Sequence, residues 1–255
     1  MHCLRSLFGL GLVTLCLSGV MWGCVSGYQV GVGRADCTGP PVEIHFMGYA
    51  NIKQVGRGLH LRQFARAFVV EDEPQASRLR FSRCGGTHTH GGPGGFLMHL
   101  LYDISILGFV PRPSRRSFRV ATWLSIKRAT DNMVDGKILT QLLVDLDNNL
   151  LGAFNWYAVH PTSMNNTNKL VTSDNMGYAA ILLEKEYNTN KVPGKGKFVG
   201  AFCSSNLGDV SPNIMGPRCS ISGNECDLLT SKCPQKEGEC FASGPGRDML
   251  RALRS

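Results

Sequence analysis

The stretch Gly86–Gly95 constrains this chain more than any other, because it combines two histidines with five glycines and a proline. If the stretch is extended, His88 and His90 lie two residues apart and point to the same face. The glycines that follow let another molecule approach the backbone closely. Neutral imidazole is the commonest protein ligand for zinc, although a zinc site needs further donors from elsewhere. The stretch therefore predicts a metal or proton-transfer site, with a polar turn carrying two solvated histidines as the alternative.

The whole chain has the composition of a globular protein. Its 255 residues are 43% hydrophobic, enough to fill the core of one large or two small domains. The net charge is +8, yet the basic residues are scattered apart from one run at Arg112–Arg116. The sequence contains no nucleic-acid-binding motif, and its aromatic residues are not interleaved with the basic ones. We therefore expect no nucleic-acid partner, and a basic surface that is either simply solvated or mildly attracted to anionic lipid.

Residues 1–27 resemble a signal peptide. Arg5 precedes the uncharged segment Leu7–Val25, and small residues lead to a cleavage site before Tyr28. The uncharged segment also reaches the lower limit for crossing a bilayer, roughly 17 residues, so an uncleaved signal anchor is the alternative. Under either interpretation residues 28–255 enter the secretory pathway, and we expect the protein outside the cell or at its surface.

Cysteine usage agrees with an oxidising compartment. Cys219, Cys226, Cys233 and Cys240 are spaced seven residues apart near the end of the chain. Four clustered cysteines in a secreted protein predict two disulfides, for which three pairings are possible. A zinc site made of the four thiolates is less favoured, because short Cys-x-x-Cys pairs are absent. The spacing alone does not choose among the pairings.

Hydrophobic patterning predicts a chain of mixed strands and helices. A helix is expected at Met176–Tyr187, with Ser173 or Asp174 as its N-cap. The expected strands are Tyr28–Gly33, Val42–Met47 and Phe198–Ser204, together with a hairpin of Ile138–Leu146 and Leu150–Val159 around a polar turn.

The middle of the chain is less clearly patterned. Leu59–Val70 fits either an amphipathic helix or a pair of strands. The apolar segment Phe96–Val110 predicts a buried helix. Pro111–Ser117 is expected to interrupt the structure before a new element begins at Val120–Arg128.

Two further segments place reactive side chains where expected strands end. His160 follows the second strand of the hairpin, and Ser211 follows the strand at 198–204 after a Gly-Asp turn. A strand end fixes the backbone while the side chain stays accessible. A serine in such a turn can be presented as a nucleophile, but the G-x-S-x-G elbow of hydrolases is absent, and a turn serine is the alternative.

Taken together, these stretches resemble the neutral ceramidase family, and the resemblance runs from Tyr28 to about Arg247. It implies an α/β fold in which a mixed sheet with flanking helices forms part of the family's catalytic domain, with a disulfide-rich segment at 219–240. The matching stretches are YQVGVGRADCTGP at 28–40, GTHTHGGPGG at 86–95, WYAVHPTSMNN at 156–166 with SDNMGYA at 173–179, and SSNLGDVSPN at 204–213 followed by GPRC.

The resemblance implies an N-acylsphingosine amidohydrolase, which hydrolyses ceramide and related N-acyl sphingoid bases to sphingosine and a fatty acid at a membrane surface or in lipid micelles. By the family pattern, His88 and His160 would bind one zinc ion. His90 would lie beside the substrate, and Ser211 would be the nucleophile. Zinc would polarise the amide carbonyl or activate a water, and a hydroxyl group or hydroxide would attack. The pattern also pairs Cys219 with Cys233 and Cys226 with Cys240.

Some parts of the family pattern are expected to be missing. Arg78–Gly86 replaces a longer strand-rich segment, and a segment with an Asn-Arg-Ser-Pro motif is missing between Val110 and Val134. In the family pattern, a glutamate and a tyrosine that complete the zinc site, and an immunoglobulin-like domain, come after the position of Ser255. The two histidines would then hold zinc together with water or with a substitute ligand such as Asp174. Two functions stay open: zinc-dependent ceramide hydrolysis, and an inactive secreted form that binds lipid or a full-length partner.

Overall fold

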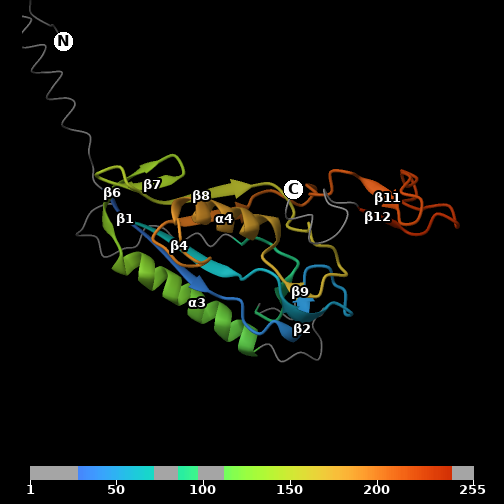
Figure 1. Ribbon diagram of the computed structural model, residues 1–255, viewed down its shortest axis with the longest axis horizontal. Coiled ribbons are helices and arrows are strands. Elements are labelled where there is room, and N and C mark those ends of the chain that lie inside the picture. The colour runs from blue at the N-terminus through green and yellow to red at the C-terminus, as the bar shows by residue number, and fades with distance from the viewer. Residues whose placement is uncertain (1–27, 72–85, 97–111, 243–255) are drawn as a thin grey trace, which may run out of the picture.

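The computed structural model describes residues 28–71, 86–96 and 112–242, and its largest element is one mixed sheet (Figure 1). The strands of this sheet are β1 (Tyr28–Asp36), β4 (Phe64–Glu71), β6 (Val134–Leu139), β7 (Leu142–Asp145), β8 (Leu150–Tyr157) and β10 (Val199–Ser204). They lie in the order β10-β8-β7-β6-β1-β4, with β8 and β10 parallel and the other neighbours antiparallel. The leader-like residues 1–27 and most of the helix predicted at 96–110 lie outside the described residues.

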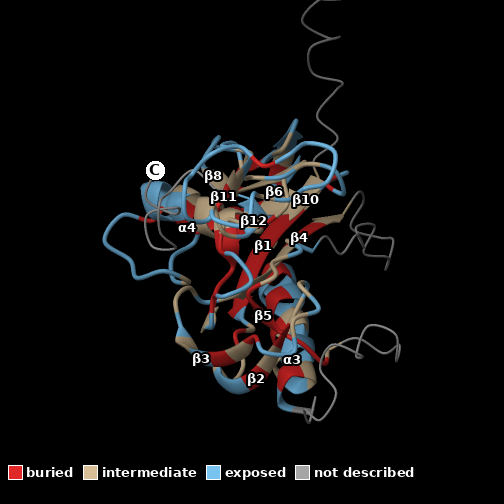
Figure 2. Ribbon diagram, turned by 90° about the vertical axis from the view of Figure 1, so that its right-hand side faces the viewer, coloured by how far each residue is buried: buried red, intermediate tan, exposed pale blue. Residues whose placement is uncertain are grey.

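Strand β1 carries different residues on its two faces. Gly31 and Gly33 face helix α3 (Arg112–Asp131), and a Cβ atom there would lie 2.0 Å from the Ala129 carbonyl oxygen or 2.1 Å from that of Ser125. Only glycine lets the helix approach the strand this closely. The alternate residues of β1 point to the opposite face, where they join the main core cluster of Val30, Val32, Phe68, Leu143, Val199 and Ala201. Strand β1 is mostly buried (Figure 2).

Helix α4 (Asp174–Tyr187) packs against β10, on the face of the main sheet opposite α3 (Figure 1). Its buried Glu184 forms ion pairs with Arg34 of β1 at 2.6 Å and with Arg66 of β4 at 2.8 Å. Because Arg34 follows Gly33 directly, the two side-chain positions point to opposite faces of the strand. The predicted α/β architecture, with a mixed sheet and flanking helices, is therefore confirmed.

A second, smaller sheet holds the glycine-rich stretch. Its strands are β2 (Val42–Met47), β3 (Val55–Leu59), β5 (Gly92–Pro93) and β9 (Leu170–Val171), in the order β5-β2-β3-β9. Ile44, Phe46 and Val171 form its buried core. Because Gly92 pairs with Met47 of β2, the end of the glycine-rich stretch is fixed against a packed sheet.

Three predictions for local structure needed correction. Within Leu59–Val70 the strand alternative is right and the helix is wrong, because β4 pairs with β1 along its whole length. The element expected to begin at Val120 begins at Arg112, inside the break expected at Pro111–Ser117, because the first turn of a helix tolerates a proline. The single strand expected at Ile138–Leu146 is two strands, β6 and β7, which are joined by a turn at Thr140.

Other predicted elements are confirmed. Strand β2 has its predicted bounds, β1 begins at the predicted residue, and β10 begins one residue late. Helix α4 begins two residues earlier than predicted. Ser173 occupies the N-cap position but makes no side-chain capping bond. Strands β7 and β8 form the predicted hairpin around a polar turn.

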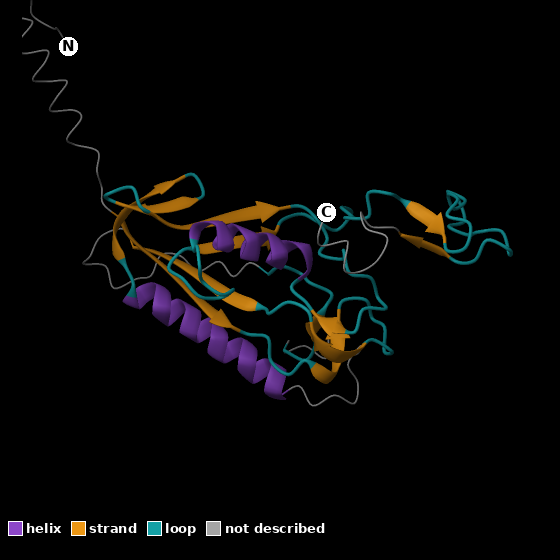
Figure 3. Cartoon of the chain, viewed as in Figure 1, coloured by secondary structure: helices purple, strands orange, loops and turns teal. Residues whose placement is uncertain are grey.

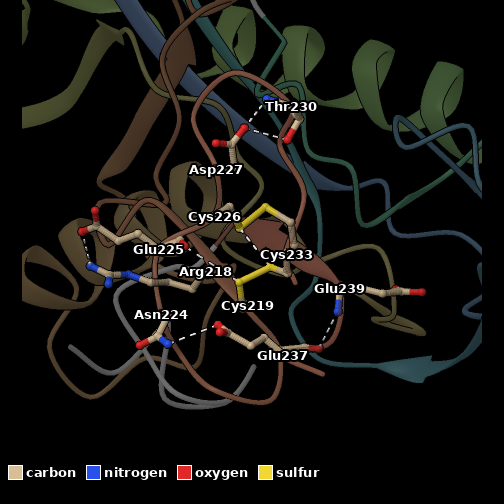
Figure 4. Close-up of a disulfide and its surroundings, with 12 residues drawn as sticks. Arg218, Cys219, Asn224, Glu225, Cys226, Asp227, Thr230, Cys233, Glu237 and Glu239 are labelled. Atoms are coloured by element: carbon tan, nitrogen blue, oxygen red, sulfur yellow. Dashed lines mark hydrogen bonds and ion pairs between the residues drawn. A yellow bond between two sulfur atoms is a disulfide. The ribbon is translucent and has the colours of Figure 1, made fainter. Parts of the chain in front are cut away.

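The last described part of the chain is a small lobe that projects from the sheets (Figure 3). A two-stranded ribbon of β11 (Pro217–Cys219) and β12 (Cys240–Ala242) lies at its base. Two disulfides stabilise it, Cys219–Cys233 and Cys226–Cys240, which is the pairing that the family resemblance implies (Figure 4). Within the three described ranges, no helix is long and apolar enough to cross a membrane.

Candidate metal centre

Three histidines converge on one point of the structure. One ring nitrogen from each of His88, His90 and His160 lies within 4.8 Å of the other two. The ring centroids are 4.9 Å apart for His88 and His90, and 5.0 Å and 5.3 Å from these two to His160. Three imidazole nitrogens are the donor number of a catalytic zinc site, in which a fourth position stays open. The cluster therefore contains a third nitrogen donor beside the two expected ligands.

The two histidines of the glycine-rich stretch do not lie on an extended strand. His88 has a left-handed backbone with φ of 60°, and a turn begins at His90. Left-handed conformations are uncommon for a residue with a side chain and often occur at functional sites. The two rings thus meet through a bend in the backbone, not through the alternation of an extended strand.

Hydrogen bonds to Thr172 fix this bend. The Thr89 hydroxyl group donates to the Thr172 carbonyl oxygen at 2.9 Å, and the Thr172 N–H donates to the Gly91 carbonyl oxygen at 2.8 Å. A Cβ atom at Gly91 would lie 2.3 Å from the Thr172 methyl carbon, so a larger residue cannot occupy this position without a shift. The residue that follows β9 therefore determines where His88 and His90 lie.

His160 comes from the loop after β8. Its backbone N–H donates to the Val210 carbonyl oxygen at 2.8 Å, and its ring Nδ1 lies 2.9 Å from the Leu207 carbonyl oxygen. A carbonyl oxygen accepts only from a protonated Nδ1, so this contact favours the tautomer whose Nε2 has a free lone pair for a metal. The parallel pairing of β8 and β10 brings the two loops together, because both strands end at the same edge of the sheet.

The start of α4 fixes the loop of His160. The buried Asp174 carboxylate accepts the N–H groups of Ser163 and Met164, each at 3.0 Å. The Asn175 side-chain amide donates to the His160 carbonyl oxygen at 3.0 Å. Burial raises the pKa of Asp174 above its ordinary value, while these N–H groups oppose the shift. Asp174, expected as a substitute ligand, instead anchors the loop.

The surroundings keep the histidines in the form that binds a metal. Burial, with smaller contributions from His88 and His160, lowers the pKa of His90 to about 4. Burial and the neighbouring His160 also lower the pKa of His88. Both rings are then neutral at pH 7, and neutral imidazole is the ligand form.

His90 also has unsatisfied hydrogen-bonding groups. Both of its ring nitrogens are buried and make no hydrogen bond within the described part of the chain. The Tyr49 ring packs edge-on against it at 4.6 Å. Buried nitrogens without partners are costly, so they indicate that a metal or a bound polar group completes this site. The donor set therefore fits a metal ion.

Ser211 lies in the loop that contacts His160. The residue before it, Val210, accepts the His160 N–H, so the two loops are neighbours. Ser211 itself is exposed, and its hydroxyl oxygen accepts the Asn213 N–H at 3.1 Å. This bond is typical of a turn serine. Its role as the nucleophile stays a prediction.

Patterning did not identify the residues that anchor the site. Thr172 and Asn175 have polar side chains of ordinary type, and no spacing in the sequence relates them to the histidines. The resemblance gave a signal for Asn175 alone, because SDNMGYA at 173–179 is one of the matching stretches and Thr172 lies just outside it. Contacts of this kind follow from the fold and cannot be obtained from local sequence.

Comparisons with known families agree with this geometry. The family model for the N-terminal part of neutral/alkaline non-lysosomal ceramidases matches residues 28–85, 83–144 and 137–255. The neutral ceramidase of Drosophila melanogaster is 60% identical over 300 residues, which cover 89% of this chain and 42% of that protein. That of Drosophila pseudoobscura pseudoobscura is 59% identical over 316 residues, which cover 95% of this chain and 44% of that protein.

The chain spans less than half the length of these relatives. Both alignments are also longer than the chain of 255 residues, so the relatives contain residues without a counterpart here. This confirms the prediction that internal segments of the family pattern are missing.

Solved structures show the same fold. The crystal structure of the neutral ceramidase from Pseudomonas aeruginosa matches with a TM-score of 0.67 and 25% identity, over 89% of this chain and 42% of that one. A ceramidase complexed with C2 matches with a TM-score of 0.64 and 28% identity, over 74% of this chain and 39% of that one.

Proposed function

Because this chain belongs to the neutral/alkaline non-lysosomal ceramidase family, we propose that it carries a zinc site for hydrolysis of the amide bond of ceramide. The products are sphingosine and a free fatty acid. The observation that supports this most strongly is the cluster of His88, His90 and His160. Its members come from two segments far apart in the sequence, and both segments lie in the regions that match the family model.

In this proposal His88 and His160 bind the metal through neutral imidazole nitrogens. His90 either provides the third nitrogen or stays beside the substrate, where its unpartnered nitrogens can bind the amide or hydroxyl groups. When bound, zinc supplies an electrophile that polarises the amide carbonyl or lowers the pKa of a water. Leu207 orients His160 through its Nδ1, and Asn175 holds the same loop from the other side.

Ser211 is the proposed nucleophile. Its exposed position leaves the hydroxyl group accessible to a lipid amide. Attack forms a bond from the serine oxygen to the amide carbon, and the C–N bond breaks as the sphingoid amine leaves with a proton. Water then hydrolyses the resulting ester and restores the serine.

We also propose that the chain acts in the secretory pathway or outside the cell, on ceramide in membranes or micelles. The signal-like residues 1–27 support this, and so do the two disulfides of the lobe, because such bonds persist in oxidising compartments. N-terminal sequencing of the protein recovered from the medium of expressing cells tests it, and retention of the whole chain inside the cell contradicts it.

The test of function is hydrolysis of a fluorescent ceramide by the purified chain, before and after treatment with a zinc chelator. We expect turnover that the chelator abolishes and that His160→Ala lacks, while His45→Gln, which changes a histidine outside the cluster, retains it. Loss of turnover in Ser211→Ala with the metal still bound supports the nucleophile assignment. A folded wild-type chain with neither zinc nor turnover favours the alternative, an inactive secreted form that binds lipid or a full-length partner.

A further inference from the structure

Helix α3 presents its larger apolar residues to solvent. The side chains that pack against the sheet are small, and Ser114, Ala121, Ser125 and Ala129 are all buried. In contrast, Val120, Trp123 and Ile126 are 47%, 61% and 42% exposed. A surface helix normally turns its large apolar residues inward and its polar ones outward. The arrangement on α3 is the reverse.

The packing against β1 explains the small residues but not the large ones. Gly31 and Gly33 bring the strand so close to α3 that only small side chains fit between them. That requirement leaves the outward positions free to be polar, and nothing in the fold demands apolar residues there. Scattered exposed apolar residues are ordinary, but three within seven residues of one helix indicate a partner.

Basic residues accompany these apolar ones. Arg116 and Arg119 are exposed on the first half of α3, and Lys127 is 51% exposed on the second half, where it pairs with Asp131 at 2.6 Å. Asp131 is the last residue of α3 and its one acidic side chain. We call Arg116, Arg119, Val120, Trp123, Ile126 and Lys127 the outer face of α3. Figure 1 shows α3 along one side of the molecule, and Figure 2 shows that the helix contains both buried and exposed residues.

We propose that the outer face of α3 docks onto the surface of an anionic lipid membrane. Helices that lie in a membrane interface combine basic residues with tryptophan and aliphatic side chains, as this face does. The basic residues are attracted to anionic headgroups, while Trp123 and its apolar neighbours enter the boundary with the acyl chains. This inference rests on the proposed function, because a ceramide hydrolase must reach a substrate that resides in a membrane. It assigns that contact to a helix outside the histidine cluster.

A second exposed apolar site provides the comparison that the test needs. Leu228 and Leu229 of the disulfide lobe are 86% and 96% exposed, in a turn that Asp227 holds by accepting the Thr230 N–H at 2.8 Å. Glu225 and Asp227 lie near them in the sequence, but Arg218 pairs with Glu225 at 3.3 Å and Lys232 is exposed close by, so the charges of this tip balance. The tip therefore lacks the excess of basic residues that the outer face of α3 has, and it serves as a control for general hydrophobicity.

The experiment is co-sedimentation of the purified chain with vesicles of phosphatidylcholine, with and without phosphatidylserine. We expect binding to the anionic vesicles, and weakening at high salt. Arg116→Glu with Arg119→Glu should lower the partition coefficient by roughly 10-fold or more, and Trp123→Ser by roughly 10-fold. Lys191→Glu with Lys195→Glu makes the same change of net charge on the loop before β10 and should have little effect, and so should Leu228→Ser with Leu229→Ser. All variants share one N-terminus, so residues 1–27 cannot cause a difference between them.

Other outcomes overturn the proposal. Equal binding by the α3 variants and the controls would exclude this face. A dimer that sedimentation equilibrium detects and Trp123→Ser disrupts, without vesicle binding, would assign the face to a second copy of the chain. Hydrolysis of ceramide in neutral detergent micelles separates the two claims, because the α3 variants should keep that activity. If the chain does not hydrolyse ceramide, its binding to vesicles can still be measured. If the chain does not bind vesicles, its hydrolysis of ceramide in micelles can still be measured.

Discussion

Helices α3 and α4 lie on opposite faces of the main sheet, α3 against β1 and β4 and α4 against β10, and they pack by different means. Between α3 and β1 the contact is made mainly by glycine, alanine and serine, with one hydrogen bond from Arg128 to the Arg34 carbonyl oxygen, and it depends on the close approach of two backbones. Between α4 and the sheet it centres on a buried ion cluster, in which Glu184 binds Arg34 and Arg66. The first contact tolerates almost any residue on the solvent side of the helix, whereas the second fixes both the position and the rotation of the helix.

The two kinds of packing suit two different roles, because in the part of the chain that the structure describes α4 positions the candidate metal centre and α3 does not. The first residues of α4, Asp174 and Asn175, bind the loop of His160, so a shift of α4 moves a histidine of the candidate metal centre. No such contact joins α3 to the histidines within the described residues, and its outer face is free to meet a partner. The buried charges of the fold thus lie on the side that positions the site.

The largest expected effect comes from removing the centre of the ion cluster. Glu184→Ala leaves two arginines buried without their partner, which should lower the free energy of unfolding by about 3–5 kcal/mol. Urea denaturation measures it, with Glu186→Ala, exposed on the same helix, as the control. Equal stability of the two variants would show that the cluster does not fix α4.

Packing of α3 should be sensitive to a single methyl group. Gly33→Ala places a Cβ atom against the backbone of α3 at 2.1 Å, and we expect a loss of about 1–3 kcal/mol in the free energy of unfolding. Gly208→Ala is the control, because a Cβ atom there meets nothing within 4 Å. If both variants unfold at the same urea concentration, the close approach of α3 to β1 is wrong.

The link from α4 to the metal centre can be tested without disturbing the ion cluster. Asn175→Ala removes the bond to the His160 carbonyl oxygen, and we expect zinc affinity to fall by roughly 10–100-fold with a small change in stability. Zinc titration and thermal unfolding separate the two effects. An unchanged zinc affinity would mean that the loop holds His160 without help from α4.

The histidines should make the metal-free chain sensitive to acid. The folded pKa of His90 is about 4, below the ordinary value of 6.5, so the unfolded chain binds more protons between these two values. The contribution of His90 to stability is therefore unaffected above about pH 7 and declines as the pH falls from about 6.5 toward 4. Urea denaturation across this range should show a smaller decline in His90→Gln, and an identical decline in both proteins would contradict the shift.

The smallest effect on stability is expected on the outer face of α3. Trp123→Ser changes a side chain that is 61% exposed, and the free energy of unfolding should change by no more than about 0.5 kcal/mol. A loss of several kcal/mol would mean that Trp123 packs in the folded chain and is not available to a lipid surface.

The sequence predicted the strands well where side chains alternate strongly. Strand β2 and the hairpin of β7 and β8 depend on local patterning and turn residues, and both are where they were expected. The start of α3 was harder to predict, because Pro113 suggests a break in the chain although the first turn of a helix accommodates a proline. Leu59–Val70 was ambiguous, because only pairing with a distant strand decides between helix and strand.

For the site, the sequence supplied the residue types and the resemblance supplied their roles. It could not show that His90 lies within reach of the other two rings, since this depends on the left-handed backbone of His88. Nor could it show the hydrogen bonds that join Thr172 to Thr89 and Asn175 to His160. The two residues of each pair are 83 and 15 positions apart in the sequence. Such contacts exist only once the chain has folded.

The most direct test of the central claim is the zinc content of the purified chain, measured by mass spectrometry after dialysis against metal-free buffer. We expect about one zinc ion per chain in the wild type, and none in His88→Ala or His160→Ala. The zinc content of His90→Ala decides whether His90 is a third ligand or a substrate contact. A wild-type chain that is folded and free of zinc, or zinc retained in His160→Ala, would contradict the proposed metal centre.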